Sequence, residues 1–411
     1  MKGTYSKLLV IMVVAMFFGN VPNYVQLTLT DPPDSAPMFW VMGVGLLALP
    51  LLATQGVRSD ILKSPLTLWC FGYAWIAMAG FLLSSQSDIT FQEVRWRFLT
   101  ITQLILFMVL FANVELARLA KQTLAAVVLF GVAVNIYELF VPLSTSRVLG
   151  RSAGLYMNPN QAGQALVMGL IFSLSVLSAW FRVPFILLTG IGVFTTFSRS
   201  AILQWVIIVV IFMLMRRVRL RDFFLPVGVS LLFVALLLLP RWDQLLTTLE
   251  SSGVINKNVE ERLDWFMDPT GISDDSSWER AYLAKEAWNK TAQHPFIGSG
   301  TGSSREVAVG AHNQYLMFMQ DHGLLGAAIL PLLILAVTWV ARGEARNLAI
   351  LFGCSVMFQG FFSHDILNQS EVLMLFSLMA VISSTSREGE MKKTQAKAIA
   401  EGGWPKVFAK T

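Results

Sequence analysis

Four arginines lie at turns or beside apolar stretches, where their positive charge could hold phosphate. Arg147 and Arg151 flank a short loop, Arg199 separates two apolar stretches in T-F-S-R-S-A, and Arg280 lies in a polar segment. A guanidinium is always charged, and its planar fork matches phosphate oxygens. Beside hydrocarbon, an arginine normally faces a cavity or a partner. Arg199 and Arg280 are predicted to be catalytic, because outer-facing arginines that converge on one point would form a receptor for pyrophosphate. Arg147 and Arg151 are predicted to bind substrate, with headgroup snorkelling or ion pairing as the alternative.

His312 opens the motif H-N-Q-Y at the start of an apolar stretch. An imidazole can accept a proton from a sugar hydroxyl near neutral pH, so His312 is predicted to be a catalytic base. A hydrogen-bonded structural histidine is the alternative, and His294, His322 and His364 compete for the role. The polar residues beside these groups are predicted to bind substrate: Asn158, Asn160, Gln161, Asn313, Gln314 and Tyr315.

Signals for a metal or a cofactor are missing from the sequence. No two histidines have a ligand spacing, and H-E-x-x-H, C-x-x-C, P-loop and G-x-G-x-x-G motifs do not occur. Cys70 and Cys354 both lie in apolar runs, so neither cysteine is expected to form a disulfide or to bind zinc. We therefore expect no cofactor and no catalytic metal. Glu138 and Asp365 lie at expected membrane ends, where either could balance an arginine or orient the histidine.

The elements that must position these residues are membrane helices. Of 411 residues, 55% are hydrophobic and 14% are charged, against about 25% charged in a soluble domain. Twelve stretches without Asp, Glu, Lys or Arg approach the roughly 20 residues that a spanning helix needs. The sequence thus predicts an all-α polytopic membrane protein with about 12 transmembrane helices. No basic cluster suggests nucleic acid as a partner.

The expected order is nine helices in residues 1–240, an outer loop domain at 241–322, three helices in 323–386 and a basic tail at 387–411. Most short-loop Lys and Arg fall on the inner side if both termini are cytoplasmic. Within the loop domain, a helix is predicted from Ser277 to Gln293, ended by His294-Pro295. The glycine run at 298–304 is predicted to be a flexible turn.

Four motifs in order resemble the O-antigen ligase and polymerase superfamily. They are R-x-x-G-x-x-x-N-P-N-Q-A at 151–162, S-R-S-A at 198–201, W-x-R with H-P-F-I-G-S-G at 278–300, and H-N-Q-Y-L-M-F-M-Q-D-H-G-L-L-G at 312–326. The resemblance covers roughly residues 150–370, and one departure is Asp321, where the family often has glutamate. It implies a GT-C-type helical fold in the bacterial inner membrane, with one large periplasmic loop and an active site facing the periplasm.

The resemblance also implies a reaction. The donor would be a glycan on undecaprenyl pyrophosphate, and the acceptor a sugar hydroxyl of lipid A–core. The transfer would invert the anomeric carbon without metal or nucleotide. One dominant outer loop favours a ligase, because polymerases often have two and the loop at 144–160 is short. A polymerase joining undecaprenyl-linked repeats is the alternative. A polysaccharide transporter or flippase is the alternative of another class, although it needs no large outer domain and usually shows repeated halves.

Overall fold

The computed structural model describes residues 2–28, 36–55, 63–216, 223, 259–260, 275–306 and 311–400. All regular elements in these ranges are helical. The longer helices are α1 (Lys2–Phe18), α2 (Val21–Thr28), α3 (Ala36–Gln55), α5 (Pro65–Leu83), α6 (Asp88–Leu110), α7 (Val114–Phe140), α8 (Pro159–Ser173), α9 (Ala179–Phe194), α10 (Arg199–Leu214), α14 (Asp275–Gln293), α15 (Gln314–His322), α16 (Ile329–Thr338), α17 (Glu344–Gly360) and α18 (Ser370–Ala400). Short 3₁₀ turns are η1 (Gly154–Tyr156), η3 (Ser303–Arg305), η4 (Gly323–Ala328) and η5 (Ile366–Asn368).

Side-chain caps set where several of these helices begin. Ser64 precedes Pro65 and accepts a hydrogen bond from the Leu66 amide at the start of α5. Asn158 and Asn313 do the same for α8 and α15, each accepting from two backbone amides of the first turn. Such caps satisfy amides that have no partner within the helix and stabilise it by about 1 kcal/mol.

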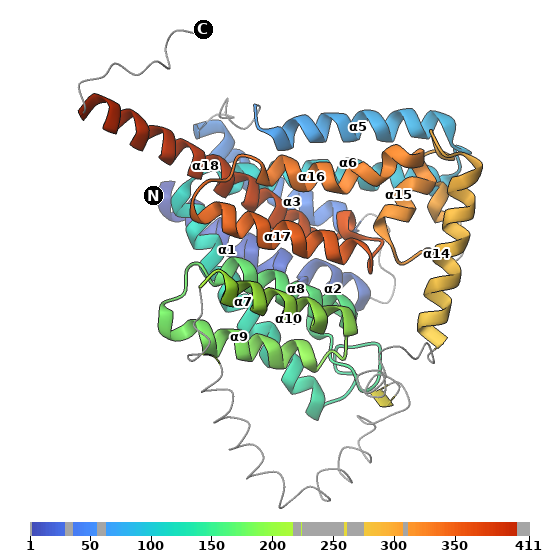
Figure 1. The fold of residues 1–411 in the computed structure, drawn as a ribbon, viewed down its shortest axis with the longest axis horizontal. Helices are drawn as coiled ribbons and strands as arrows, with labels where there is room; N and C mark the ends of the chain where they lie inside the picture. The colour runs from blue at the N-terminus through green and yellow to red at the C-terminus, as the bar shows by residue number, and fades with distance from the viewer. Residues whose placement is uncertain are drawn as a thin grey trace, which may run out of the picture.

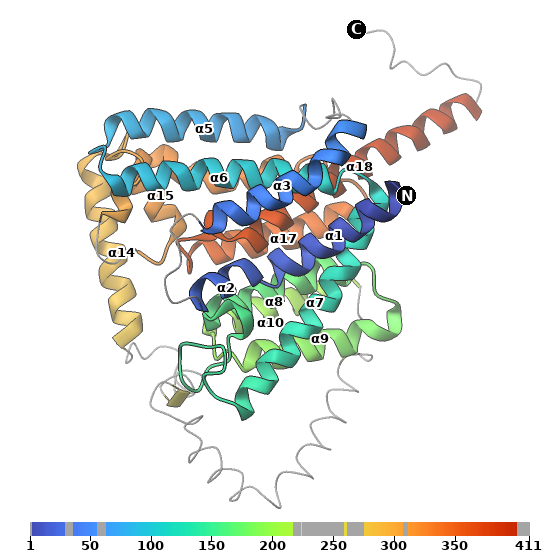
Figure 2. The ribbon, with the colours of Figure 1, turned by 180° about the vertical axis from the view of Figure 1, so that it is seen from behind.

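The helices form a bundle in which most axes run side by side (Figures 1 and 2). The start of α1 and the end of α18 lie at one end of the bundle, and α14 lies across the opposite end. The interior is packed with large apolar side chains such as Phe17, Phe107 and Phe111, of which Phe17 and Phe107 meet edge to face at 5.0 Å. That both termini lie on one side of the membrane stays a prediction.

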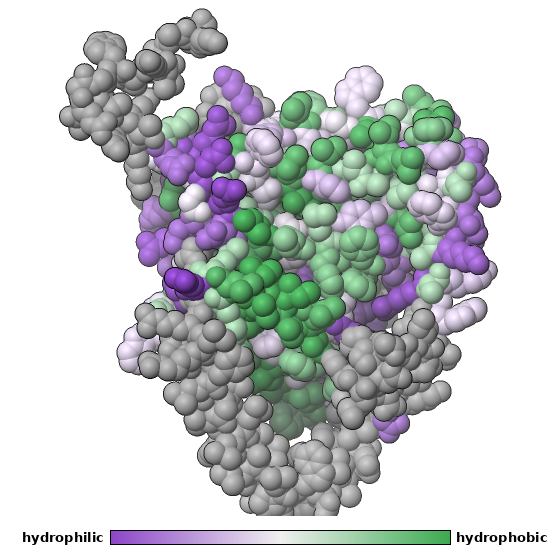
Figure 3. Space-filling view, in the orientation of Figure 1, coloured by the Kyte–Doolittle hydropathy of each residue, from purple (hydrophilic) through white to green (hydrophobic). Residues whose placement is uncertain are grey.

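Three helical segments are long and apolar enough to cross a membrane: Pro65–Leu83, Val114–Phe140 and Gln314–Thr338. The pair α1 and α2, bent by 52° between them, would make a fourth among the described residues. On the face seen in Figure 3, hydrophilic residues gather at the two ends of the bundle, and hydrophobic residues lie between them. The described residues therefore form an all-α structure, which is consistent with a membrane protein. The twelve spans stay a prediction, and the expected span between Asp222 and Arg241 lies outside the described residues except for Phe223.

Several boundaries differ from those expected from charge alone. Helix α14 ends at Gln293 as predicted but begins at Asp275, two residues before the expected start. Helix α18 continues past Arg387 to Ala400, so the basic tail begins as helix. Helix α15 begins at Gln314, inside the range 241–322 assigned to the loop domain, of which 241–258, 261–274 and 307–310 lie outside the described residues.

Candidate active site

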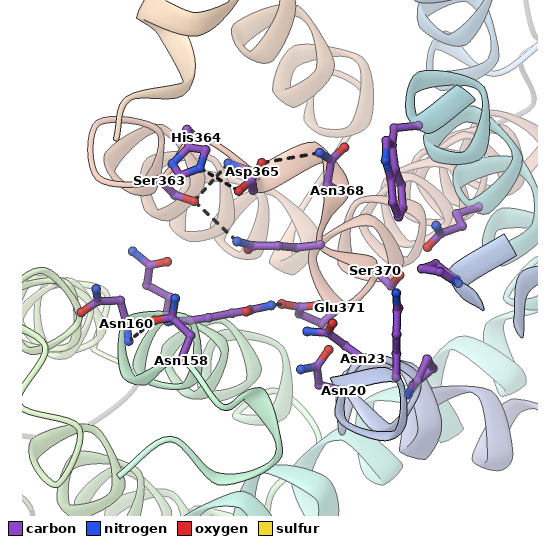
Figure 4. Close-up of a pocket in the computed structure, with 18 of the residues that line it drawn as sticks. Asn20, Asn23, Asn158, Asn160, Ser363, His364, Asp365, Asn368, Ser370 and Glu371 are labelled. Carbon is purple, nitrogen blue, oxygen red and sulfur yellow. Dashed lines mark hydrogen bonds and ion pairs between the residues drawn. The ribbon is translucent and has the colours of Figure 1, made fainter. Parts of the chain in front are cut away.

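A polar cavity of about 720 Å³ lies between α1, α2, α6, α8 and the turn that joins α17 to α18. Figure 4 shows His364 and Asp365 on one wall, Asn158 and Asn160 on a second, and Asn20 on a third. Side-chain amides dominate the lining, and an amide both donates and accepts hydrogen bonds, as a sugar hydroxyl does. These amides are Asn20, Asn23, Gln26, Gln92, Gln103, Asn158, Asn160, Gln161, Gln164, Asn368 and Gln369.

His312 lies on the wall of this cavity, in the short connection before α15. Its ring is half-buried, and the ring centroid of His364 lies 4.9 Å away. Burial lowers the pKa of His312 below its ordinary value, and the nearby His364 and Arg280 lower it further. The imidazole is therefore neutral at pH 7, which is the form that accepts a proton.

His364 contacts the carboxylate of Asp365, which is itself paired with an arginine. Its Nε2 lies 2.9 Å from Oδ2 of Asp365, and the other Asp365 oxygen accepts from Arg305. Burial alone would raise the pKa of Asp365, but the hydrogen bond with His364 and the charge of Arg305 outweigh it and hold that pKa well below its usual range. The sequence left open whether Asp365 balances an arginine or orients a histidine, and the structure shows contacts of both kinds.

A buried arginine connects this wall to the interior of the bundle. Arg97 is only 1% exposed, and its guanidinium contacts Asp321, His322 and Glu93. Glu93 in turn lies 3.3 Å from Nε of Arg305. A buried charge is tolerated only when it is paired and hydrogen-bonded. An unbroken series of ion pairs and hydrogen bonds therefore extends from Asp321 to His364.

Sequence reasoning missed Arg97, Glu93 and Arg305 as members of the site. It treated Arg97 as the border of an apolar stretch, whereas α6 runs through it from Asp88 to Leu110. The available signal was an ionisable pair four residues apart that continues into apolar sequence, because such groups inside a membrane helix usually mark a functional site.

The glycine turn at 298–302 is packed and is not the flexible turn that was predicted. Gly298, Gly300 and Gly302 all have φ between +69° and +97°. The turn fits against α5 and α15: the Gly300 amide donates to Asp321 O, and the Thr301 amide donates to Gly80 O, both at 3.0 Å. A Cβ on Gly300 would lie 2.6 Å from the Ser84 nitrogen. Glycine is needed there for close approach as well as for backbone freedom.

Of the predicted site residues, His312, Asn158, Asn160 and Gln161 line the cavity, and the four arginines do not. Arg151 lies behind Asn160, donating to its side-chain oxygen at 2.9 Å and to Thr196 O. Arg147 is exposed and donates to Leu27 O at 3.3 Å. Arg199 begins α10 and is half-buried. Arg280, on α14, lies near enough for its charge to affect His312.

The three residues after His312 bind the protein itself. Asn313 caps α15, the buried Gln314 accepts from the Ile366 amide at 2.9 Å, and the Tyr315 hydroxyl donates to Met357 O at 3.0 Å. Together these contacts fix α15 against the turn that carries His364. Glu138 likewise accepts from backbone amides of the 145–154 loop, including Ala153 at 2.7 Å, and so holds that loop in place.

Within the described ranges, no group of three or more His, Cys, Asp or Glu side chains is placed to hold a metal ion. The cavity also contains Glu371, whose Oε1 accepts from Gln161 Nε2 at 2.6 Å. Glu371 is thus held by another side chain of the lining.

A family model described as O-antigen ligase matches residues 184–331. The chain is similar to O-antigen ligases over this segment. The match includes Arg199, Arg280 and His312, and it confirms the resemblance seen in the motifs. No curated protein matches the chain. The matched segment contains His312, which lines the cavity, while α1, α2 and α6, which precede the matched segment, supply another wall. The family supports an activity of the O-antigen ligase or polymerase type.

Proposed function

We propose that this protein is a glycosyltransferase that moves O-antigen glycan from undecaprenyl pyrophosphate to a sugar hydroxyl of lipid A–core. The observation that carries the proposal is His312, a half-buried histidine with a lowered pKa on the wall of a polar cavity. The match to O-antigen ligase over the segment that contains it supports the same activity.

In the proposed reaction, His312 takes the proton of the acceptor hydroxyl. The hydroxyl oxygen forms the new bond to the anomeric carbon, and the bond from that carbon to the pyrophosphate oxygen breaks. The electron pair leaves with the pyrophosphate, and attack opposite the leaving group inverts the anomeric carbon. Arg280, whose charge affects His312, and Arg199 would stabilise the negative charge that develops on the leaving group, which would therefore extend beyond the lining of the cavity toward them.

The amide-rich lining suits the carbohydrate part of the substrates. A volume of about 720 Å³ falls within the usual range of 300–1,000 Å³ for small-ligand sites. Gln103 is almost fully buried, lines the cavity and has no hydrogen-bond partner for Oε1 among the described residues. A sugar hydroxyl would satisfy this oxygen. The lipid tail of the donor would lie between helices, with the reaction on the periplasmic face of the inner membrane.

The test pairs donor binding with product formation for His312→Ala. Base catalysis of this kind is worth about 10²–10⁴-fold, so transfer should fall by that factor while binding of the lipid-linked donor is retained. His294→Ala is the matched control, since His294 is exposed at the end of α14 and outside the cavity lining.

Loss of donor binding together with transfer would make His312 a donor ligand, and full transfer would remove it from the mechanism. Supplying lipid A–core and undecaprenyl-linked repeats as separate acceptors distinguishes a ligase from a polymerase. Elongation of the linked repeats without transfer to lipid A–core would contradict the ligase assignment.

A further inference from the structure

A second cavity, of about 220 Å³, lies between the starts of α7, α9 and α17 and the ends of α8 and α10. Charge distribution in the sequence predicts this end to be cytoplasmic, away from His312. Its polar lining residues are Lys121, Ser175, Arg182, Glu344 and Asn347. Its apolar lining residues are Ile171, Leu174, Phe212, Met215, Ala345, Leu348, Leu351 and Ile382. A pocket with one polar and one apolar part matches an amphipathic ligand.

The two cations are positioned to bind an anion. Nζ of Lys121 donates to the Ser175 hydroxyl at 3.1 Å, which fixes the ammonium group beside the cavity. Nε of Arg182 is buried and has no hydrogen-bond partner among the described residues. Glu344 contributes one carboxylate to the lining, so the lining carries one more positive than negative charge. A buried donor without a partner is costly, and an anionic oxygen would satisfy it.

Aromatic side chains place this site at the membrane surface. Trp180 and Phe181, directly before Arg182, are 90% and 66% exposed, and Trp339 at the end of α16 is 70% exposed. Tryptophan is enriched where lipid headgroups meet water. The basic run R-R-V-R-L-R starts at 216, immediately after the lining residue Met215. Basic pockets between helices on the cytoplasmic side are suited to anionic headgroups.

We propose that this cavity binds the headgroup phosphate of an anionic phospholipid from the cytoplasmic leaflet. Arg182 and Lys121 contact the phosphate oxygens, and the apolar lining covers the glycerol and the first acyl carbons. This lipid is neither donor nor acceptor. It is a ligand that holds α7, α9 and α17 together at the end of the bundle opposite the cavity of His312.

The experiment measures binding of phosphatidylglycerol, phosphatidylcholine and inorganic phosphate to the purified full chain, by native mass spectrometry and by the midpoint of thermal unfolding. Phosphatidylglycerol should bind and raise the midpoint, while phosphatidylcholine and inorganic phosphate should not. Removing each cation should weaken phosphatidylglycerol binding by roughly tenfold, as expected for loss of one charge-assisted contact. The variants to be measured are Lys121→Gln, Arg182→Gln and the double variant that carries both substitutions.

The matched control is Arg342→Gln with Arg346→Gln, which removes two positive charges from exposed positions on the same side without touching the lining. Equal loss of binding in this control would mean general surface attraction and would overturn the proposal. Stabilisation by inorganic phosphate alone would show a site for soluble anions. If the double variant Lys121→Gln with Arg182→Gln does not fold, the single Lys121→Gln variant is measured instead. An unchanged affinity of that variant for phosphatidylglycerol would overturn the proposal.

Discussion

At the scale of single residues, Arg280 and Arg147 are predicted to differ in how much they depend on guanidinium shape. Arg280→Lys keeps the charge near His312 but loses the planar fork, so transfer should fall by about 10²-fold, as when one donor to a developing anion is lost. Arg147→Lys should be mild, because Arg147 is exposed and donates to Leu27 O, which needs only a donor. Initial transfer rates with saturating donor measure both, and a near-normal Arg280→Lys rate would exclude bidentate recognition there.

The lowered pKa of His312 predicts the pH dependence of transfer. Neutral imidazole is the active form of His312. The rate of transfer should therefore stay constant as the pH falls to about 6.5, the ordinary pKa of histidine, and decline only below that pH. His364→Gln removes one group that lowers this pKa, so the pKa of His312 rises and the decline moves to higher pH. Rate against pH for wild type, His364→Gln and His294→Gln tests this. A shift toward acid in His364→Gln would contradict it.

At the scale of helices, Arg97 joins α6 to α15. Arg97→Leu would leave Asp321 and Glu93 buried without that cation, and the free energy of unfolding should fall by about 3–5 kcal/mol. Arg95→Leu is the control, since Arg95 is on the same helix but exposed. Adding Asp321→Leu to Arg97→Leu should recover part of the loss, and denaturant unfolding in detergent measures it. An Arg97→Leu protein as stable as the control would show that the pair contributes little.

The helix boundaries were predictable from the sequence where neighbouring residues determine them. The candidate site was predictable only in part. His294-Pro295 marks the end of α14 because proline and its predecessor resist helical geometry. The N-P-N-Q motif and His312 reach the cavity as expected. Asn20 and Gln103, by contrast, are single amides inside apolar runs, and no periodicity reveals that they share a cavity with residues far away. The contact between Arg97 and Asp321 depends on packing of helices distant in sequence.

At the scale of the whole molecule, topology is the testable consequence of the charge pattern. A reporter fused to the C-terminus should be cytoplasmic, because the end of α18 lies at the same end of the bundle as the start of α1, which is predicted to be cytoplasmic (Figures 1 and 2). A reporter inserted near Asn258 should be periplasmic, since that position belongs to the segment predicted to face outward. Enzymatic reporters active only in one compartment measure both. A periplasmic signal from the C-terminus would require an odd number of spans and would contradict the twelve-helix prediction.

The lining of the main cavity extends along the chain from Phe17 in α1 to Glu371 in α18. During synthesis, the first wall is therefore made long before the last one. A growing chain cannot complete the lining of this cavity until α18 has been made, so the proposed activity would begin only then. Under the proposed function, a partly made chain would then be unable to consume lipid-linked glycan. Loss of the last helix would remove a wall of the cavity even though His312 and the arginines had already been made.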